Sequence, residues 1–154
     1  MGAKTMSRTP LEMTPDGLPA YQTDLFPTFL RGNLPPRILV VDDDTAIREL
    51  YAEALKRQGY KVDTAEDGDA GWAVLQAAHH NSDNYALLIT DNNMPKLTGI
   101  ELVRKLRAAQ IGVPIILASG TAPLNTDRLH LAAVLEKPFS TDTLVQTVKS
   151  ILLC

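Results

Sequence analysis

Short apolar runs alternate with longer amphipathic stretches along most of the chain. Each run has five or six residues, mainly aliphatic and β-branched, which is typical of strands buried on both faces. The runs predicted as strands are 37–42, 60–65, 85–90, 113–118 and 132–136.

The stretches between the first four runs, and the last stretch of the chain, repeat their apolar residues at helical spacing. In the first of them, Ile47, Leu50, Tyr51 and Leu55 form one stripe, as expected for a helix that covers a core. Regular alternation of strands and helices predicts an α/β fold: a doubly wound parallel sheet with helices on both faces. The predicted helices are 44–59, 69–80, 99–110 and 140–153.

The stretch between the fourth and fifth strands is too short for a full helix. Pro123 and Asn125 come early in it, and only "TDRLHL", residues 126–131, has helical character. Isolated helices of this length are marginal in water. We therefore expect a shortened fourth helix, of a single turn or irregular.

Polar side chains stand where the predicted strands end. Asp42 and Asp43 follow the first strand, Asp91 the third, Ser119 the fourth and Lys137 the fifth. In sheets of this kind, ligands bind beyond the carboxyl ends of the strands. The sequence thus predicts a pocket with up to three carboxylates, a hydroxyl and an ammonium group.

Each of these residues also has an ordinary structural explanation. Asp91 could form a turn, Ser119 and Gly120 could form another, and Lys137 could be a solvated surface residue. Asp44, just before a predicted helix, is expected to be its N-cap. The succession of these residues at strand ends carries more weight than any of them alone.

Four stretches, "ILVVDDD", "LLITDNNMP", "IILASG" and "LEKPF", resemble the receiver domain of two-component response regulators. The resemblance implies a five-stranded flavodoxin-like sheet of order 2-1-3-4-5. Val134 departs from the family, because receivers commonly carry an aromatic residue at this position.

The resemblance also implies a role for each matching residue. Asp91 would be the phosphoacceptor, and Ser119 and Lys137 would bind the phosphoryl group. The peptide bond before Pro138 would be cis, and Thr121, with Asn93, would tune hydrolysis. The implied Mg²⁺ ligands are Asp42, Asp43, Asp91 and the backbone carbonyl of Asn93.

The function expected from the resemblance is signalling. A histidine kinase or a histidine phosphotransfer protein would donate the phosphoryl group, and the domain would act through contacts with an unknown protein target. It would not be an enzyme beyond its own phosphorylation and slow autodephosphorylation. A receiver fragment of a hybrid sensor kinase is the alternative. A phosphoaspartate-type hydrolase fits less well, because Asn93 stands where that chemistry needs a second aspartate.

Composition narrows the function classes further. The formal net charge is −3 and no basic face stands out, so direct nucleic-acid binding is not expected. No apolar run reaches the length of a membrane span, and the N-terminus lacks the apolar core of a signal peptide. Cys154 is the single cysteine, which fits a cytoplasmic protein.

Residues 1–36 have a different texture from residues 37–154, the expected receiver domain. They hold six of the ten prolines and equal numbers of acidic and basic residues. A proline-rich N-terminal tail or linker is predicted. "DLFPTFLRGN" leaves two interpretations open: a segment without a packed structure, native or an expression remnant, or an arm that docks on this domain or on a partner.

Overall fold

The computed structural model describes residues 34–121 and 126–153. The expected tail, apart from Leu34 to Pro36, lies outside these residues, as do Pro123, Asn125 and Cys154. The chain from Pro36 onward forms one compact unit.

The unit is built around a five-stranded parallel sheet of order β2-β1-β3-β4-β5, which confirms the predicted fold class and strand order. β3 begins two residues later than predicted and includes Asp91. The strands are β1 (Arg37–Val41), β2 (Lys61–Ala65), β3 (Leu87–Asp91), β4 (Ile115–Ser119) and β5 (Ala133–Glu136).

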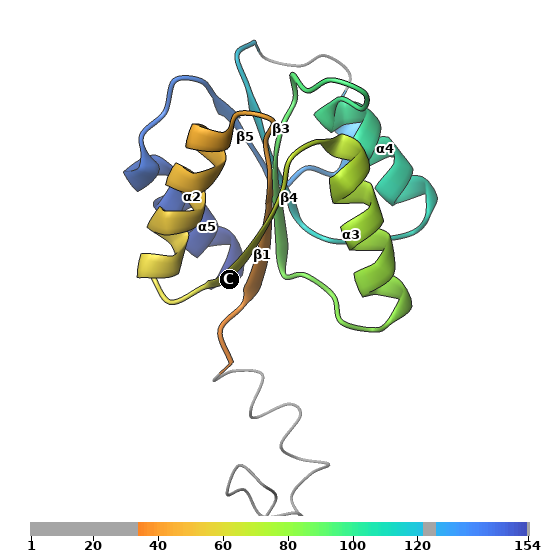
Figure 1. Cartoon of the computed structure of the whole chain (residues 1–154), viewed down its shortest axis with the longest axis horizontal. Coiled ribbons are helices and arrows are strands. Elements are labelled where there is room, and N and C mark those ends of the chain that lie inside the picture. Colours follow the sequence, from red (N-terminus) through yellow and green to blue (C-terminus); the bar gives the residue numbers. More distant parts are fainter. Residues whose placement is uncertain (1–33, 122–125, 154) are drawn as a thin grey trace, which may run out of the picture. The chain divides into compact units, whose positions relative to one another are not determined.

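Two helices cover each face of the sheet. Figure 1 shows the sheet edge-on, with α2 and α5 on one side and α3 and α4 on the other. The helix bounds lie within two residues of the predicted ones. They are α2 (Thr45–Arg57), α3 (Gly68–His80), α4 (Gly99–Ala108) and α5 (Thr141–Leu152).

Each helix starts at a side chain that accepts a hydrogen bond from a backbone N–H of the first turn. Such caps satisfy donors that have no partner within the helix. The expectation for Asp44 is confirmed, because its side chain accepts from the Ile47 N–H. The four N-caps are Asp44, Asp67, Thr98 and Ser140.

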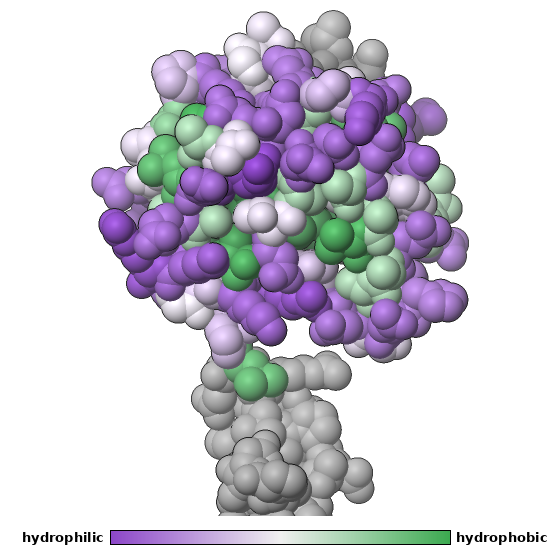
Figure 2. Space-filling model, in the orientation of Figure 1, coloured by the Kyte–Doolittle hydropathy of each residue, from purple (hydrophilic) through white to green (hydrophobic). Residues whose placement is uncertain are grey.

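The buried side chains form two hydrophobic clusters, one on each face of the sheet. One contains Leu39 and Leu88 with residues of α3 and α4, and the other contains Ile38 and Leu87 with residues of α2 and α5. Leu50 corrects the predicted stripe of α2: it is 52% exposed. It lies at the edge of the stripe, beyond the reach of the sheet. On the face of the molecule in Figure 2, hydrophilic side chains predominate and hydrophobic ones show only in small patches.

The connection between β4 and β5 contains a 3-10 helix, η2, of three residues, Asp127–Leu129. This agrees with the predicted short fourth helix. The Arg107 side chain of α4 holds this connection in place of helical packing. Its guanidinium donates to the carbonyl oxygens of Leu129, His130, Ile111 and Val113.

The strand register decides which residues meet at the carboxyl end of the sheet. Val41 pairs with Thr90, Asp91 with Ala118, and Ser119 with Glu136. The residues that follow these strands therefore come out at one edge, across the order β1-β3-β4-β5.

Candidate functional site

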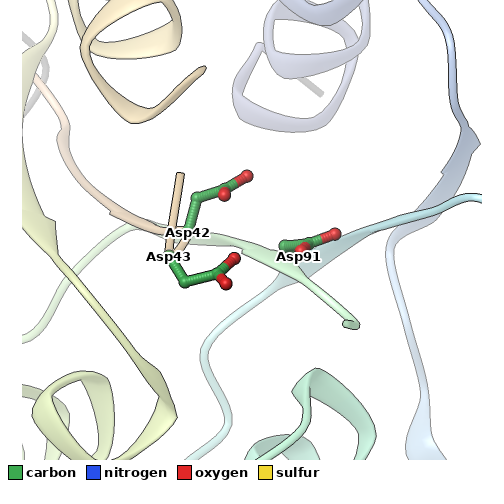
Figure 3. A group of neighbouring side chains, drawn as sticks. All are labelled: Asp42, Asp43 and Asp91. Carbon is green, nitrogen blue, oxygen red and sulfur yellow. The ribbon is translucent and has the colours of Figure 1, made fainter. Parts of the chain in front are cut away.

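Three carboxylates gather where β1 and β3 end. Oxygen atoms of Asp42, Asp43 and Asp91 all lie within 4.8 Å of one another. In Figure 3 the carboxylates of Asp42 and Asp43 point from the end of β1 toward the side of Asp91. Asp42 and Asp91 are buried, whereas Asp43 is exposed, so the cluster is open to solvent on one side only.

The turn after β1 has its own supports, and they separate the three consecutive aspartates. The Asp44 N–H donates to Asp42 Oδ1 over 2.9 Å, and the Arg48 guanidinium donates to the Asp42 carbonyl oxygen over 2.6 Å. The Asp44 side chain caps α2. Asp42 and Asp43 are therefore left for the cluster, and Asp44 is not part of it.

Asp91 is fixed on the most deeply buried part of the sheet. Every residue of β3 is buried, and Asp91 itself is 5% exposed. The start of α4 packs against its backbone: a Cβ atom added at Gly99 would lie 2.4 Å from the Asp91 carbonyl oxygen. The carboxylate therefore sits on a rigid element, as precise positioning of a reactive group requires.

Asn92 supports this arrangement in a way that sequence reasoning missed. Its side-chain Oδ1 accepts from the Ile100 N–H over 3.0 Å, and its carbonyl accepts from the Gly99 N–H over 3.0 Å. Asn92 thus ties the residue after Asp91 to the first turn of α4. The signal was present in the sequence, since an asparagine seven residues before a glycine-led helix can satisfy free N–H groups.

Lys137 brings a positive charge to the cluster from the end of β5. Its Nζ lies 2.9 Å from Asp91 Oδ1 and 3.9 Å from Asp42 Oδ2. Its backbone N–H donates to the Ser119 carbonyl, and the Lys137–Pro138 peptide bond is cis. Partial burial lowers the pKa of Lys137, but the ion pair with Asp91 and the charge of Asp42 outweigh it, so the pKa is raised.

The cluster carries more negative charge than Lys137 can neutralise. Burial raises the pKa of Asp42, the hydrogen bond from the Asp44 N–H works against this shift, and the Asp91 charge adds to it. Asp91 Oδ1 is buried and accepts no directional hydrogen bond among the described residues, although it lies beside the Lys137 ammonium. Three convergent carboxylates with an unsatisfied oxygen fit the oxygen-ligand chemistry of Mg²⁺.

The remaining predicted residues lie near this edge but are engaged differently. The Ser119 hydroxyl donates to the Thr121 carbonyl and accepts from the Thr121 N–H. Thr121 and Asn93 are exposed. The structure therefore brings together Asp42, Asp43, Asp91 and Lys137, while the Ser119 side chain is bonded within its own turn.

A second concave feature lies at the other end of the sheet. A pocket of about 300 Å³ is lined by Leu75, His79, Tyr85, Ile111 and Val113, among others. Tyr85 and Val113 precede β3 and β4, so the pocket is on the amino side of the strands, away from the carboxylates. Among the described residues, no helix is long and apolar enough to cross a membrane.

The comparisons with known proteins agree on one family. The family model described as response regulator receiver domain matches residues 38–149. The chain is similar to Response regulator MprA of Mycolicibacterium vanbaalenii, with 32% identity over 123 residues, which are 77% of this chain and 51% of MprA. It is also similar to the transcriptional regulatory protein CpxR homolog of Haemophilus influenzae, with 34% identity over 75% of this chain and 50% of that protein.

A solved structure shows the same fold. The response regulator protein TrrA of Thermotoga maritima, in complex with Mg²⁺ and BeF, matches with a TM-score of 0.63 and 35% identity. The match covers 76% of this chain and 99% of TrrA. The chain thus spans a whole solved receiver but only about half the length of the curated relatives above.

Proposed function

The chain belongs to the family of response regulator receiver domains, and on that premise we propose that Asp91 is its phosphoacceptor. The observation that carries the proposal is the placement of Asp91 between two positive and negative partners: Lys137 Nζ at 2.9 Å on one side and the carboxylates of Asp42 and Asp43 on the other. The buried Oδ1 is held at the end of a rigid strand.

The reaction needs a phosphoryl donor of the phosphohistidine type. An Asp91 carboxylate oxygen attacks the phosphorus atom, the new O–P bond forms, and the P–N bond to the donor imidazole breaks with its electron pair going to the imidazole nitrogen. There is little covalent chemistry for the protein to perform, so its contribution is positioning and electrostatic stabilisation.

A Mg²⁺ ion would be held by Asp42, Asp43, Asp91 and the Asn93 backbone carbonyl. When bound, it would offset the negative charge that accumulates between the carboxylate and the phosphoryl oxygens. Lys137 supplies a second positive group, and its raised pKa keeps the ammonium charged at neutral pH. Ser119 would reach the phosphoryl group after leaving its bonds to Thr121.

The resulting acyl phosphate would be lost slowly to water. Thr121 and Asn93 are exposed at the site, and neither is a strong general base, so we propose that they affect hydrolysis by placing water. We do not propose an enzyme with sustained turnover. A hydrolase of the phosphoaspartate type is disfavoured because Asn93 cannot act as the general acid that a second aspartate would provide.

The partners follow from the same chemistry. We propose a histidine kinase or a histidine phosphotransfer protein as the donor, and a protein target that recognises the phosphorylated domain. The relatives described as regulators are about twice as long as the matched segment. The role of a whole protein, including any DNA binding of the kind the name of the CpxR homolog suggests, or attachment to a sensor kinase, is therefore a separate proposal.

Incubation with acetyl phosphate and Mg²⁺ tests the proposal. Intact-mass spectrometry should show one added phosphoryl group on the parent and none on Asp91→Asn. Asp83→Asn is the matched control, because it removes a carboxylate at the amino end of the sheet, where Asp83 pairs with Arg37. Modification that persists in Asp91→Asn would overturn the assignment, as would sustained turnover of a generic phosphate ester.

A further inference from the structure

The inner face of α2 places an aromatic residue beside the proposed site. Tyr51 is 6% exposed and belongs to the hydrophobic cluster under α2 and α5. Its ring stacks on the ring of Phe139, with centroids 5.5 Å apart and an interplanar angle of 24°. Pairs of this geometry stabilise beyond the area they bury.

Phe139 is two residues after Lys137, in the segment that leaves β5. The start of this segment is held by the sheet, through the bond from the Lys137 N–H to the Ser119 carbonyl over 2.8 Å. Its other end is held by the ring of Phe139, which packs against the cluster under α2. The segment is short, and Lys137 stands between these two attachments.

The phenol of Tyr51 also lies within electrostatic reach of the cluster. Burial raises the pKa of Tyr51, the Lys137 ammonium lowers it, and the charges of Asp42 and Asp91 raise it, with a net rise. The phenol is therefore neutral at physiological pH. It adds no further negative charge beside three carboxylates.

We propose that Tyr51 is a positioning residue for Lys137: its ring, stacked on Phe139, fixes the segment 137–139 against α2 and sets where the ammonium meets the phosphoryl group. The inference rests on the proposed function of Asp91 and assigns a supporting residue on an element that contributes no group to the phosphoryl itself. α2 thereby contributes to phosphoryl binding as well as to the core.

A plain core residue would behave differently. Removing it would lower stability and leave the affinity of the folded protein for ligands unchanged. The positioning role predicts a split between two ligands: Mg²⁺, which is held by the carboxylates, and beryllofluoride, a phosphoryl mimic that also needs Lys137.

The experiment compares four full-length proteins by NMR, below their unfolding temperatures. Beryllofluoride affinity is measured in saturating Mg²⁺, and Mg²⁺ affinity is measured alone. Tyr51→Leu should weaken beryllofluoride binding about tenfold, the upper range of a lost aromatic pair, with Mg²⁺ affinity within twofold of the parent. Tyr51→Phe keeps the ring and should bind beryllofluoride as the parent does.

Tyr85→Leu is the matched control. Tyr85 is also 6% exposed, so the same substitution removes a similarly buried ring, but at the amino end of the sheet. It should lower stability and leave both affinities unchanged. Parental beryllofluoride affinity in folded Tyr51→Leu would overturn the inference, as would a parallel loss of Mg²⁺ affinity. If the parent itself binds no beryllofluoride, the proposed function fails instead.

Discussion

Three carboxylates share one lysine at the carboxyl end of the sheet, and this imbalance has a measurable effect. Two carboxylates about 4 Å apart repel by about 4 kcal/mol at an effective dielectric constant near 20. Lys137 pairs closely with Asp91 and only at 3.9 Å with Asp42. Asp43, the exposed member, has the solvent as its main compensation.

Mg²⁺ should therefore stabilise the folded domain. If the dissociation constant is about 1 mM, 10 mM Mg²⁺ raises the free energy of unfolding by about 1.4 kcal/mol. Asp43→Asn removes one ligand and one repulsive charge. We expect it to raise the free energy of unfolding without metal and to reduce the increment from Mg²⁺, measured by urea unfolding at constant ionic strength.

Asp83→Asn again serves as the control for this measurement. Its carboxylate pairs with Arg37 at the amino end of the sheet, so the Mg²⁺ increment should remain as in the parent. An Asp43→Asn variant that is less stable than the parent without metal would show that repulsion in the cluster is negligible.

At the scale of elements, the contact between α4 and the end of β3 controls the acceptor. Gly99 opens α4, and an added Cβ would lie 2.4 Å from the Asp91 carbonyl and 2.9 Å from Asn92 Cα. Backbone atoms cannot yield as a flexible side chain can. The start of α4 and the end of β3 are thus packed as one unit.

Gly99→Ala should shift this unit. We expect a loss of about 1–3 kcal/mol in the free energy of unfolding, as for other overpacked sites, and slower modification of Asp91 by acetyl phosphate. Gly112→Ala is the control, because its added Cβ meets no atom within 4 Å. Equal behaviour of the two variants would contradict the proposed coupling between α4 and Asp91.

Arg107 on α4 compensates for the short η2. Its guanidinium binds carbonyl oxygens that no fourth helix is present to organise, among them those of Leu129 and Val113. Removal of the guanidinium would leave partly buried acceptors unpaired, at about 1–3 kcal/mol for each that water cannot reach.

Arg107→Met should therefore lower the free energy of unfolding by at least about 2 kcal/mol, in urea titrations. Arg104→Met, an exposed position on the same helix, should change it by less than about 0.5 kcal/mol. If the two variants are equally stable, Arg107 does not hold the β4–β5 connection.

The elements were predictable because hydrophobic periodicity and capping agree in this sequence. The α/β alternation, the parallel sheet and the short segment after β4 follow from the pattern, while the strand order came from the resemblance to receivers. The exposed position of Leu50 was missed, because a stripe in the sequence does not reveal how far the sheet extends beneath the helix. The bonds of Asn92 and Arg107 were missed because both depend on distant backbone atoms that only the folded chain supplies.

The candidate site was predictable in its members more than in its geometry. Strand-end logic brought Asp42, Asp43, Asp91 and Lys137 to one edge, where the structure has them. The engagement of the Ser119 hydroxyl with Thr121 could not be foreseen. It depends on the turn after β4, where two conformations of a small hydroxyl side chain have similar energies.

At the scale of the whole molecule, the domain is a rigid sheet that presents one reactive edge. Its two hydrophobic clusters hold the sheet between helix pairs, and the site residues come from the ends of three strands. The chain spans about half the length of the curated relatives, so the domain supplies the phosphorylated part of whatever output a longer protein has.

The most direct test of the central claim is to locate the phosphoryl group. The full chain is treated with acetyl phosphate and Mg²⁺, and the acyl phosphate is reduced with borohydride, which converts the modified aspartate to homoserine. Peptide mass spectrometry then identifies the position. The account predicts homoserine at position 91 only, and only when Mg²⁺ is present. Homoserine at position 42 or 43, or equal labelling at 91 with the metal chelated, would contradict it.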